Sequence, residues 1–269
     1  MNSASGRLTK DGIRIYEPVD YAGMAEAGRI AATILDEIAP HIFVGQTTAE
    51  LDGIITEMVT AHGAKSATIG YKGYQHASCI SVNHVVCHGI PADKRIKEGD
   101  ILNIDVTVIL DGWYGDTSRM YAAGKLPRKS ERLIQVTHDA LFKGISAVMP
   151  GNSFGDIGHA IQTYVENHRM SVVKDFCGHG LGQVFHAPPN VLHYGQPGTG
   201  PVLEEGMFFT IEPMVNLGRS ETKVLADDWT AVTRDKSLSA QFEHSVGVTA
   251  TGVEIFTLSP ANSFHPTYK

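Results

Sequence analysis

The chain has 269 residues, 42% of them hydrophobic and 19% charged, which is the composition of an ordinary soluble protein with room for one large domain. Its net charge of −7 and the lack of a long basic run argue against nucleic-acid recognition, and no stretch approaches the ~20 apolar residues of a membrane span. The polar N-terminus lacks the apolar core of a signal peptide, and three cysteines without a CxxC motif fit free thiols in a reducing cytoplasm.

The predicted helices come in two similar pairs. Long amphipathic helices are predicted at roughly 18–39 and 130–148. Each precedes one copy of a faint repeat, in which GQTTAELDGIITEMVTAH at 45–62 resembles GNSFGDIGHAIQTYVENH at 151–168. In both copies a threonine or serine stands three positions before an acidic residue, and apolar residues follow at helical spacing, as at the start of a capped helix. The sequence therefore indicates two halves, each with two helices followed by strands.

An acidic hairpin is predicted between Asn103 and Met120. The alternation in NIDVTVIL is typical of a strand, Asp-Gly is a strong two-residue turn signal, and WYGDTSRM is the returning strand. This register places Thr107 opposite Asp116, so Asp105 and Asp116 share a face as diagonal neighbours, with Cα atoms roughly 7–8 Å apart. Two like charges that close repel each other unless a cation lies between them. The pattern favours a bound cation over an acid that points to water from an edge strand.

Three histidines stand in segments rich in glycine or proline. His179 lies between glycines in CGHGLG, and VCHGIP with His88 corresponds in the repeat to VFHAPP with His186. Such segments are predicted to be loops, from which an imidazole can reach a metal or a substrate. A lone histidine in a loop is more often a surface residue, and the sequence alone leaves that alternative open.

Two apolar strands each contain one glutamate. Glu212 lies in MFFTIEPMVN and Glu243 in SAQFEHSVGVTA, where His244 follows it and should face the opposite way. An unpaired carboxylate in an apolar strand is costly, and the alternative of four separate salt bridges finds few Lys or Arg nearby in the sequence. With Asp105, Asp116 and a histidine, these glutamates form an oxygen-rich set suited to divalent transition metals. Two ions about 3.5–4 Å apart would be a natural arrangement.

The ordered motifs NIDVT, GDTSRM, CGHGLG, FTIEPM and SAQFEH closely resemble those of the type I methionine aminopeptidases. The resemblance covers about residues 18–258, nearly the whole chain, and five candidate ligands in this order are highly specific. It implies an α/β (α+β) pita-bread fold, in which a pseudo-twofold antiparallel β-sheet core is flanked by helices. We therefore expect a single catalytic aminopeptidase domain at 18–258, between a polar N-terminal extension at 1–17 and a C-terminal tail at 259–269.

The resemblance also implies two divalent metal ions, which would be Co, Mn, Fe or Zn. Their ligands would be Asp105, Asp116, His179, Glu212 and Glu243. Asp116 and Glu243 would bridge both ions. Asp105 would bind one ion, and His179 with Glu212 would bind the other. A monovalent cation site found in some members of the family matches Asn83, Val85 and Ser239.

The residues that would contact the substrate also follow from the resemblance. His88 and His186 match the family's two substrate-contacting histidines, and together with Glu212 they would be the catalytic residues. The pocket for the methionine side chain would be lined by Tyr71, Tyr74, Cys79, Phe185 and Trp229. Thr68 departs from the pattern, because some relatives have a pocket cysteine at that position.

The implied reaction is hydrolysis of the N-terminal methionine from nascent proteins and peptides whose second residue is small. A dinuclear metal-bound hydroxide would attack the scissile carbonyl, because metal ions lower the pKa of bound water. Glu212 would carry a proton to the leaving amine, and His186 would donate to the carbonyl oxygen. We expect a cytoplasmic monomer with no membrane or nucleic-acid partner, and a contact with the ribosome stays open.

Other proteins share parts of this pattern. An Xaa-Pro peptidase of the same fold usually carries a sizeable extra N-terminal domain, whereas only residues 1–17 precede the expected domain here. A non-catalytic binding module of this fold tends to lose metal ligands, and all five are present. A metal-storage protein would not need the histidine pair. Methionine removal is therefore the preferred interpretation, with the Xaa-Pro peptidase and the binding module as alternatives.

Overall fold

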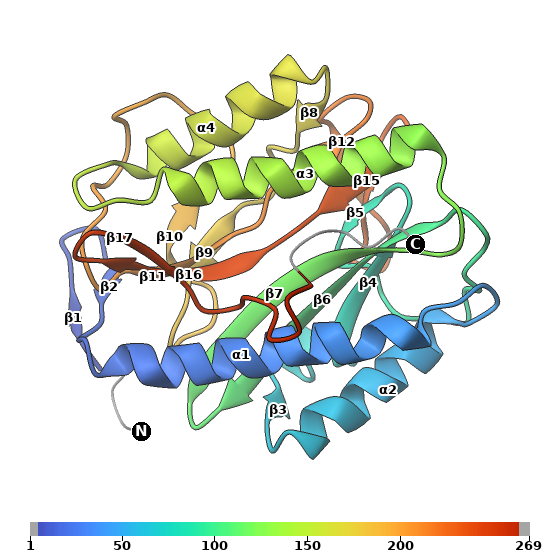
Figure 1. Cartoon of the computed structure of the whole chain (residues 1–269), viewed down its shortest axis with the longest axis horizontal. Coiled ribbons are helices and arrows are strands. Elements are labelled where there is room, and N and C mark those ends of the chain that lie inside the picture. Colours follow the sequence, from blue (N-terminus) through green and yellow to red (C-terminus); the bar gives the residue numbers. More distant parts are fainter. Residues whose placement is uncertain (1–4, 264–269) are drawn as a thin grey trace.

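Two pairs of α-helices border a set of antiparallel β-sheets in the computed structural model, which describes residues 5–263 (Figure 1). The helices are α1 Asp20–Ile38, α2 Thr48–Ala61, α3 Arg128–Ser146 and α4 Phe154–Asn167, with short 3₁₀ helices at Ala39–His41 and Tyr71–Gly73. α1 and α2 lie on one side of the strands, and α3 and α4 lie on the other. The two long helices, α1 and α3, begin and end within two residues of their predicted bounds, which confirms them.

Both shorter helices start with the capping pairs that the repeat predicts. The Thr47 N–H donates to Glu50 Oε2 at 2.8 Å before α2, and the Ser153 N–H donates to Asp156 Oδ2 at 2.7 Å before α4. Each pair satisfies a backbone group that a helix start leaves without a partner. α2 and α4 also occupy the same positions within their repeat copies. The repeat in the sequence is therefore a repeat in the structure.

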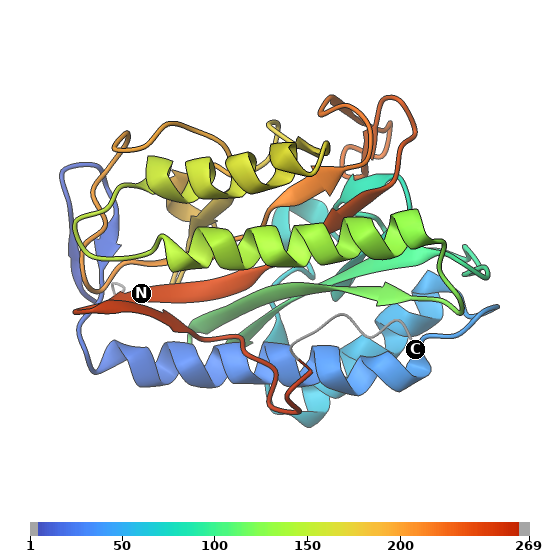
Figure 2. The same ribbon diagram turned by 45° about the horizontal axis from the view of Figure 1, so that its top comes forward.

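The strands form several antiparallel sheets between the helix pairs. In the first half of the chain they are β1 Arg7–Leu8, β2 Arg14–Ile15, β3 Lys65–Ser66, β4 Ser78–Val82, β5 Val85–Cys87, β6 Ile101–Leu110 and β7 Trp113–Ala122. In the second half they are β8 Ser171–Val172, β9 Gly178–Gly180, β10 Ala187–Val191, β11 Phe208–Ile211, β12 Met214–Asn216, β13 Thr222–Val224, β14 Ala231–Thr233, β15 Ser239–Gln241, β16 His244–Thr249 and β17 Gly252–Ile255. Figure 2 shows β7 and β16 between α1 and α3.

The sheets follow the two halves of the chain except at β5, a strand of the first half that pairs with β14 of the second. β3, β6 and β4 are neighbours in one sheet, and β7 joins it at β6. The second half contributes a five-stranded sheet in the order β10-β9-β11-β16-β17, while β15-β12-β8 and β13-β14-β5 form two three-stranded sheets. Every pairing is antiparallel. The expected α/β class, with an antiparallel core flanked by helices, is confirmed.

The acidic hairpin has the predicted register. β6 and β7 pair across the Asp-Gly turn, with Thr107 opposite Asp116. The two turn residues have φ angles of 48° and 86°, and positive φ at both is what a type I′ turn requires. Asp105 and Asp116 therefore face the same side of the hairpin, as predicted.

Two strands that the sequence predicts as continuous are each broken at their glutamate. The segment at 207–216 forms β11 and β12 with Glu212 in the gap, and the segment at 239–250 forms β15 and β16 with Glu243 in the gap. β11 pairs with β16 in one sheet, and β12 pairs with β15 in another. At each break the chain leaves one sheet and enters another. Neither Glu212 nor Glu243 therefore belongs to the regular ladders of these strands.

Each half of the molecule has its own hydrophobic core. One core packs α1 and α2 against β4 and β6, and includes the fully buried Leu35 and Ile104. The other packs α3 and α4 against β11 and β16, and includes the fully buried Phe209. With an apolar core on either side, the polar side chains of the central strands meet between the two halves.

The two ends of the chain are described only in part. Residues 1–4 of the expected N-terminal extension and 264–269 of the expected C-terminal tail lie outside the described residues. β1 and β2 form a small two-stranded sheet, and Ile13 and Ile15 are buried in the second core. Across residues 5–263, no helix has the length and hydropathy needed to span a membrane.

Candidate active site

A cavity of about 760 Å³ lies where the strands of the two halves meet. Every residue predicted as a metal ligand, substrate contact or pocket wall lines this cavity: Asp105, Asp116, His179, Glu212, Glu243, His88, His186, Tyr71, Tyr74, Cys79, Phe185 and Trp229. Thr68 lines it as well. Residues far apart in the sequence therefore come together in one place, as the motifs predict.

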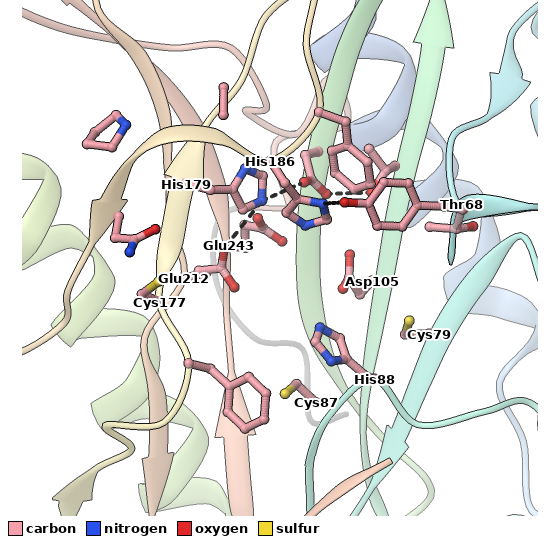
Figure 3. A pocket seen from close by; sticks show the side chains of 18 of the residues that line it. Thr68, Cys79, Cys87, His88, Asp105, Cys177, His179, His186, Glu212 and Glu243 are labelled. Atoms are coloured by element: carbon pink, nitrogen blue, oxygen red, sulfur yellow. Dashed lines mark hydrogen bonds and ion pairs between the residues drawn. The ribbon is translucent and has the colours of Figure 1, made fainter. Parts of the chain in front are cut away.

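Asp116, His179 and Glu243 form the centre of an acidic group in this cavity. They come from β7, from β9 and from the gap before β16. One ligand atom of each lies within 4.8 Å of the other two, and all three side chains are buried. His179 Nε2 lies 3.4 Å from Asp116 Oδ2 and 3.8 Å from Glu212 Oε1. Figure 3 shows Glu212 and Glu243 near His179, with Asp105 on the other side of the space.

The carboxylates have few cationic neighbours. Lys72 is the only lysine or arginine among the described residues that line the cavity, and its ammonium group lies over an aromatic ring. Withdrawal from water, and then the charge of Asp116, raise the pKa of Asp105 and of Glu243 well above their ordinary values. Withdrawal from water is also the main cause that raises the pKa of Glu212 to about 7. Such a group of acids can hold its full negative charge only if a cation balances it.

The donor set fits divalent transition metal ions. Carboxylate oxygens and one imidazole nitrogen are ligands that Co, Mn, Fe and Zn all accept. His179 Nδ1 donates to Gly180 O at 3.1 Å, which leaves Nε2 as the nitrogen that can bind a metal. Ligating histidines usually have their second nitrogen held in this way. The site can therefore hold divalent cations with the side chains that are present.

Sequence reasoning missed the uncharged side chains that orient the acids. Thr107 Oγ1 donates to Asp116 Oδ1 at 2.7 Å, and Thr210 Oγ1 donates to Glu212 Oε1 at 2.8 Å. Gln241 Nε2 donates to Glu212 Oε2 at 3.2 Å. The sequence could have predicted both threonine contacts. Thr107 faces Asp116 in the hairpin register, and Thr210 stands two residues before Glu212, on the same face of a strand.

His179 lies in a strand and not in the predicted loop. It is the middle residue of β9, which pairs with β10 and β11, and its side chain is buried, so the surface alternative is wrong for this residue. A Cβ atom at Gly178 would lie 2.3 Å from Thr210 O, and one at Gly180 would lie 2.1 Å from Pro188 O. The glycines are therefore required by the close approach of neighbouring chain segments.

His88 and His186 adopt matching backbone conformations in the two halves. Their φ angles are 55° and 57°, in the left-handed region that residues other than glycine rarely adopt. Withdrawal from water lowers the pKa of both, that of His186 to about 4. Both rings are therefore neutral near pH 7, and each has one N–H to donate. Backbone conformations of this kind cluster at functional sites, where the surroundings hold them in place.

Aromatic rings form one wall of the cavity. The ring centroids of Tyr71 and Phe185 are 4.9 Å apart, and those of Tyr74 and Trp229 are also 4.9 Å apart. Cys79 is buried beside them, and its withdrawal from water raises the pKa of its thiol, so it stays neutral. This wall can accommodate an elongated apolar side chain next to the acidic group.

The residues matched to a monovalent cation are not among the described residues that line this cavity. They lie close to one another, since the Ser239 N–H donates to Asn83 O at 2.9 Å and Val85 is the first residue of β5. Ser239 Oγ is buried without a hydrogen-bond partner among residues 5–263. A hydroxyl oxygen of this kind is a suitable ligand for a cation, and the monovalent site stays a prediction.

Comparisons with known proteins agree with this site. The sequence profile of metallopeptidase family M24 matches residues 22–250. A curated methionine aminopeptidase of Rickettsia prowazekii is 56% identical over 257 residues, which are 95% of this chain and 99% of that protein. The methionine aminopeptidase of Escherichia coli strain K12 is 50% identical over 248 residues, which are 91% of this chain and 94% of that protein.

Solved structures show the same relationship. The crystal structure of the Rickettsia prowazekii methionine aminopeptidase matches with a TM-score of 0.91, covering 91% of this chain and 100% of that chain at 56% identity. The prolidase from Pyrococcus horikoshii OT3 matches with a TM-score of 0.71, covering 90% of this chain and 63% of that chain. At 20% identity, the likeness to the prolidase shows the fold alone. The chain therefore belongs to the methionine aminopeptidases of metallopeptidase family M24.

Proposed function

We propose that this chain hydrolyses the peptide bond after an N-terminal methionine, with two divalent metal ions bound in the cavity. The ions would be Co, Mn, Fe or Zn, and their ligands would be Asp105, Asp116, His179, Glu212 and Glu243. The observation that carries the proposal is the convergence of these donors in one cavity beside an aromatic wall. The activity named for the two curated relatives supports the choice of substrate.

Glu212 would act as the proton carrier. When bound, the two ions would supply a hydroxide at neutral pH by lowering the pKa of water and would polarise the scissile carbonyl. The Glu212 carboxylate is held by Thr210 and Gln241 at the cavity lining. From there it would take a proton from the attacking water and pass it to the leaving amine.

His186 would stabilise the charge that develops on the carbonyl oxygen by donating a hydrogen bond from Nε2. Its Nδ1 lies 2.8 Å from the Tyr71 hydroxyl, which can donate to it and so keep the ring proton on Nε2. His88 packs edge-on against Phe176, with ring centroids 5.6 Å apart. It would be the second histidine, beside His186, that contacts the substrate.

The aromatic wall would select methionine at the first position. Contacts between a thioether sulfur and an aromatic ring contribute roughly 0.3–1.5 kcal/mol each, and Tyr74 and Trp229 offer two such rings. A large second residue would push the scissile carbonyl away from Glu212 and His186, and a misplacement of about 1 Å can cost roughly 10²-fold in rate. Small second residues should therefore be preferred.

The proposed substrates are nascent proteins and peptides in the cytoplasm, and the chain would act as a monomer. A contact with the ribosome stays open to test. The catalytic domain would extend over 18–258 and would be completed by Asp11 and Ile13 of the N-terminal segment, which line the cavity. A monovalent cation would bind near Asn83, Val85 and Ser239.

The proposal is tested by peptide hydrolysis with protein freed of metal by a chelator. Met-Ala-Ser, Met-Asn-Ser and Ala-Pro-Ser are each assayed without metal and with added Mn, Fe or Co. We expect no turnover without metal, and with metal a much faster release of the first residue from Met-Ala-Ser than from the other two peptides. Preferential cleavage of Ala-Pro-Ser would support the Xaa-Pro peptidase instead. Absence of turnover with every peptide and metal would support the binding module.

A further inference from the structure

A histidine outside all of the predicted motifs lies directly behind Glu212. His193 follows β10, which ends at Val191, and its side chain is fully buried, at 0% relative exposure. Its Nε2 accepts a hydrogen bond from the backbone N–H of Glu212 at 3.0 Å. His193 is not among the described residues that line the cavity. It therefore does not touch a substrate bound in the cavity, and its link to the site is the hydrogen bond to Glu212.

Glu212 needs this acceptor because it lies at the break between β11 and β12. The ladder of β11 with β16 ends at Ile211, and the ladder of β12 with β15 begins at Met214. Pro213, the next residue, has no N–H of its own. The N–H of Glu212 is thus outside both ladders, and a backbone N–H without a partner away from water is destabilising. The hydrogen bond to His193 Nε2 gives the Glu212 N–H a partner at this break.

The His193 ring can accept only in its neutral form. A neutral imidazole has one donor and one acceptor nitrogen, so an accepting Nε2 places the proton on Nδ1. Nδ1 is buried and has no hydrogen-bond partner among residues 5–263. A buried donor without a partner is costly, so packing alone does not favour a histidine here.

The carboxylate of the same glutamate is held from two other directions. Thr210 Oγ1 donates to Oε1 at 2.8 Å, and Gln241 Nε2 donates to Oε2 at 3.2 Å. These two bonds fix the end of the Glu212 side chain, while the bond to His193 fixes its origin on the backbone. Loss of the hold at either end would allow the carboxylate to turn away from the acidic group.

We propose that His193 is a positioning residue, whose Nε2 holds the backbone at Glu212 so that the carboxylate is directed into the cavity. The inference rests on the proposed function, which gives Glu212 metal ligation and proton transfer. Groups that hold a metal ligand without touching the metal typically contribute about 10–100-fold to metal affinity or activity. Loss of the acceptor should lower kcat and metal affinity, and should leave KM nearly unchanged because the aromatic wall is untouched.

Three variants separate the acceptor from the bulk of the ring. His193→Met keeps a side chain of similar length with only a weak acceptor, and His193→Gln keeps an amide oxygen that can accept. His168→Met is the matched control, because the His168 ring lies at the end of α4 and pairs with Tyr164 O of its own helix at 2.8 Å. The measurements are kcat and KM on Met-Ala-Ser, Co²⁺ affinity by calorimetry, the visible absorption spectrum of the Co²⁺-loaded protein, and Tm.

For His193→Met we expect kcat and Co²⁺ affinity to fall about 10–100-fold, with a changed Co²⁺ spectrum and a KM close to that of the parent. His193→Gln should recover most of both losses, and His168→Met should match the parent. A folded His193→Met protein with normal kcat and Co²⁺ affinity would overturn the inference. A His193→Gln protein no better than His193→Met would also overturn it, because the acceptor would then not be the cause.

Further variants distinguish a His193 variant that does not fold from an error in the proposed function. If His193→Met does not fold, His193→Phe replaces it, and if neither folds then His193 is a residue of the core and the inference is overturned. Glu212→Gln is measured in parallel. If Glu212→Gln is inactive, the proposed function stands whatever the His193 variants show. Full activity of Glu212→Gln would instead contradict the role proposed for Glu212 itself.

Discussion

Removal of the metal ions should make the stability of this protein fall as the pH rises. In the folded chain without metal, withdrawal from water raises the pKa of Asp105, Glu212 and Glu243, that of Glu212 from 4.5 to about 7. The folded state therefore binds more protons than the unfolded state between these two values. A carboxyl group with a raised pKa leaves the fold undisturbed below pH 4.5 and destabilises it progressively as the pH rises through 7.

The size of the effect follows from the same values. One pKa unit corresponds to about 1.4 kcal/mol, so the rise from 4.5 to about 7 at Glu212 amounts to about 3 kcal/mol. His179 acts in the same direction: burial opposes its charged form, but Asp116 and Glu212 outweigh burial and raise its pKa. Its stabilising charge is present at low pH and is lost as the pH rises through the raised pKa. We therefore expect a loss of roughly 2–3 kcal/mol between pH 5 and pH 8.

Urea unfolding of chelator-treated protein at pH 5 and pH 8 measures the loss in the free energy of unfolding. The same experiment is repeated with excess Mn²⁺ for comparison. Mn²⁺ should stabilise the protein more at pH 8 than at pH 5, because ligands must be deprotonated to bind metal. Glu212→Gln is the control, since an amide does not titrate and this variant should lose part of the pH dependence. Metal-free stability that is equal at the two pH values, or higher at pH 8, would show that the buried carboxyl groups do not have raised pKa values in the folded chain.

Asp116→Asn and Glu243→Gln should each remove most activity and lower metal content, because each deletes a charge that we propose bridges the two ions; two tightly bound ions with near-normal turnover would contradict this. His88→Ala and His186→Ala should keep their metal but lose about 10²–10³-fold in kcat/KM, and loss of metal from a folded variant would make that histidine a ligand. Tyr71→Phe should lower kcat up to about tenfold with normal metal content, since His186 Nδ1 loses its partner. An unchanged kcat in steady-state kinetics would show that Tyr71 does not act through His186 and only lines the pocket.

The sequence predicts the structure well where a few neighbouring residues decide the geometry. The Asp-Gly turn sets the register of the hairpin, and the register places Asp105 and Asp116 on one face. The capping pairs set the starts of α2 and α4 in the same way. In both cases the interacting residues are only a few positions apart in the chain, so the local sequence contains the necessary information.

The rest of the site depends on contacts between distant segments. The break at Glu243 arises because β15 pairs with β12 while β16 pairs with β11, and the local sequence does not contain these partners. The glycines beside His179 predict a loop. In the structure they make room for the carbonyls of Thr210 and Pro188, and the local sequence contains no information on these distant contacts. His193 lies outside every motif because its role comes from one hydrogen bond to a residue in another strand segment.

The proposed function requires one cavity to hold two metal ions between five side chains. Anomalous diffraction at the manganese edge, from crystals of the Mn²⁺-loaded enzyme, would locate the ions directly. We predict two anomalous peaks about 3.5–4 Å apart in the cavity, both contacted by Asp116 and Glu243. One peak should also be contacted by Asp105, and the other by His179 and Glu212. A single fully occupied peak, or peaks outside this cavity, would show that the five side chains do not hold two metal ions.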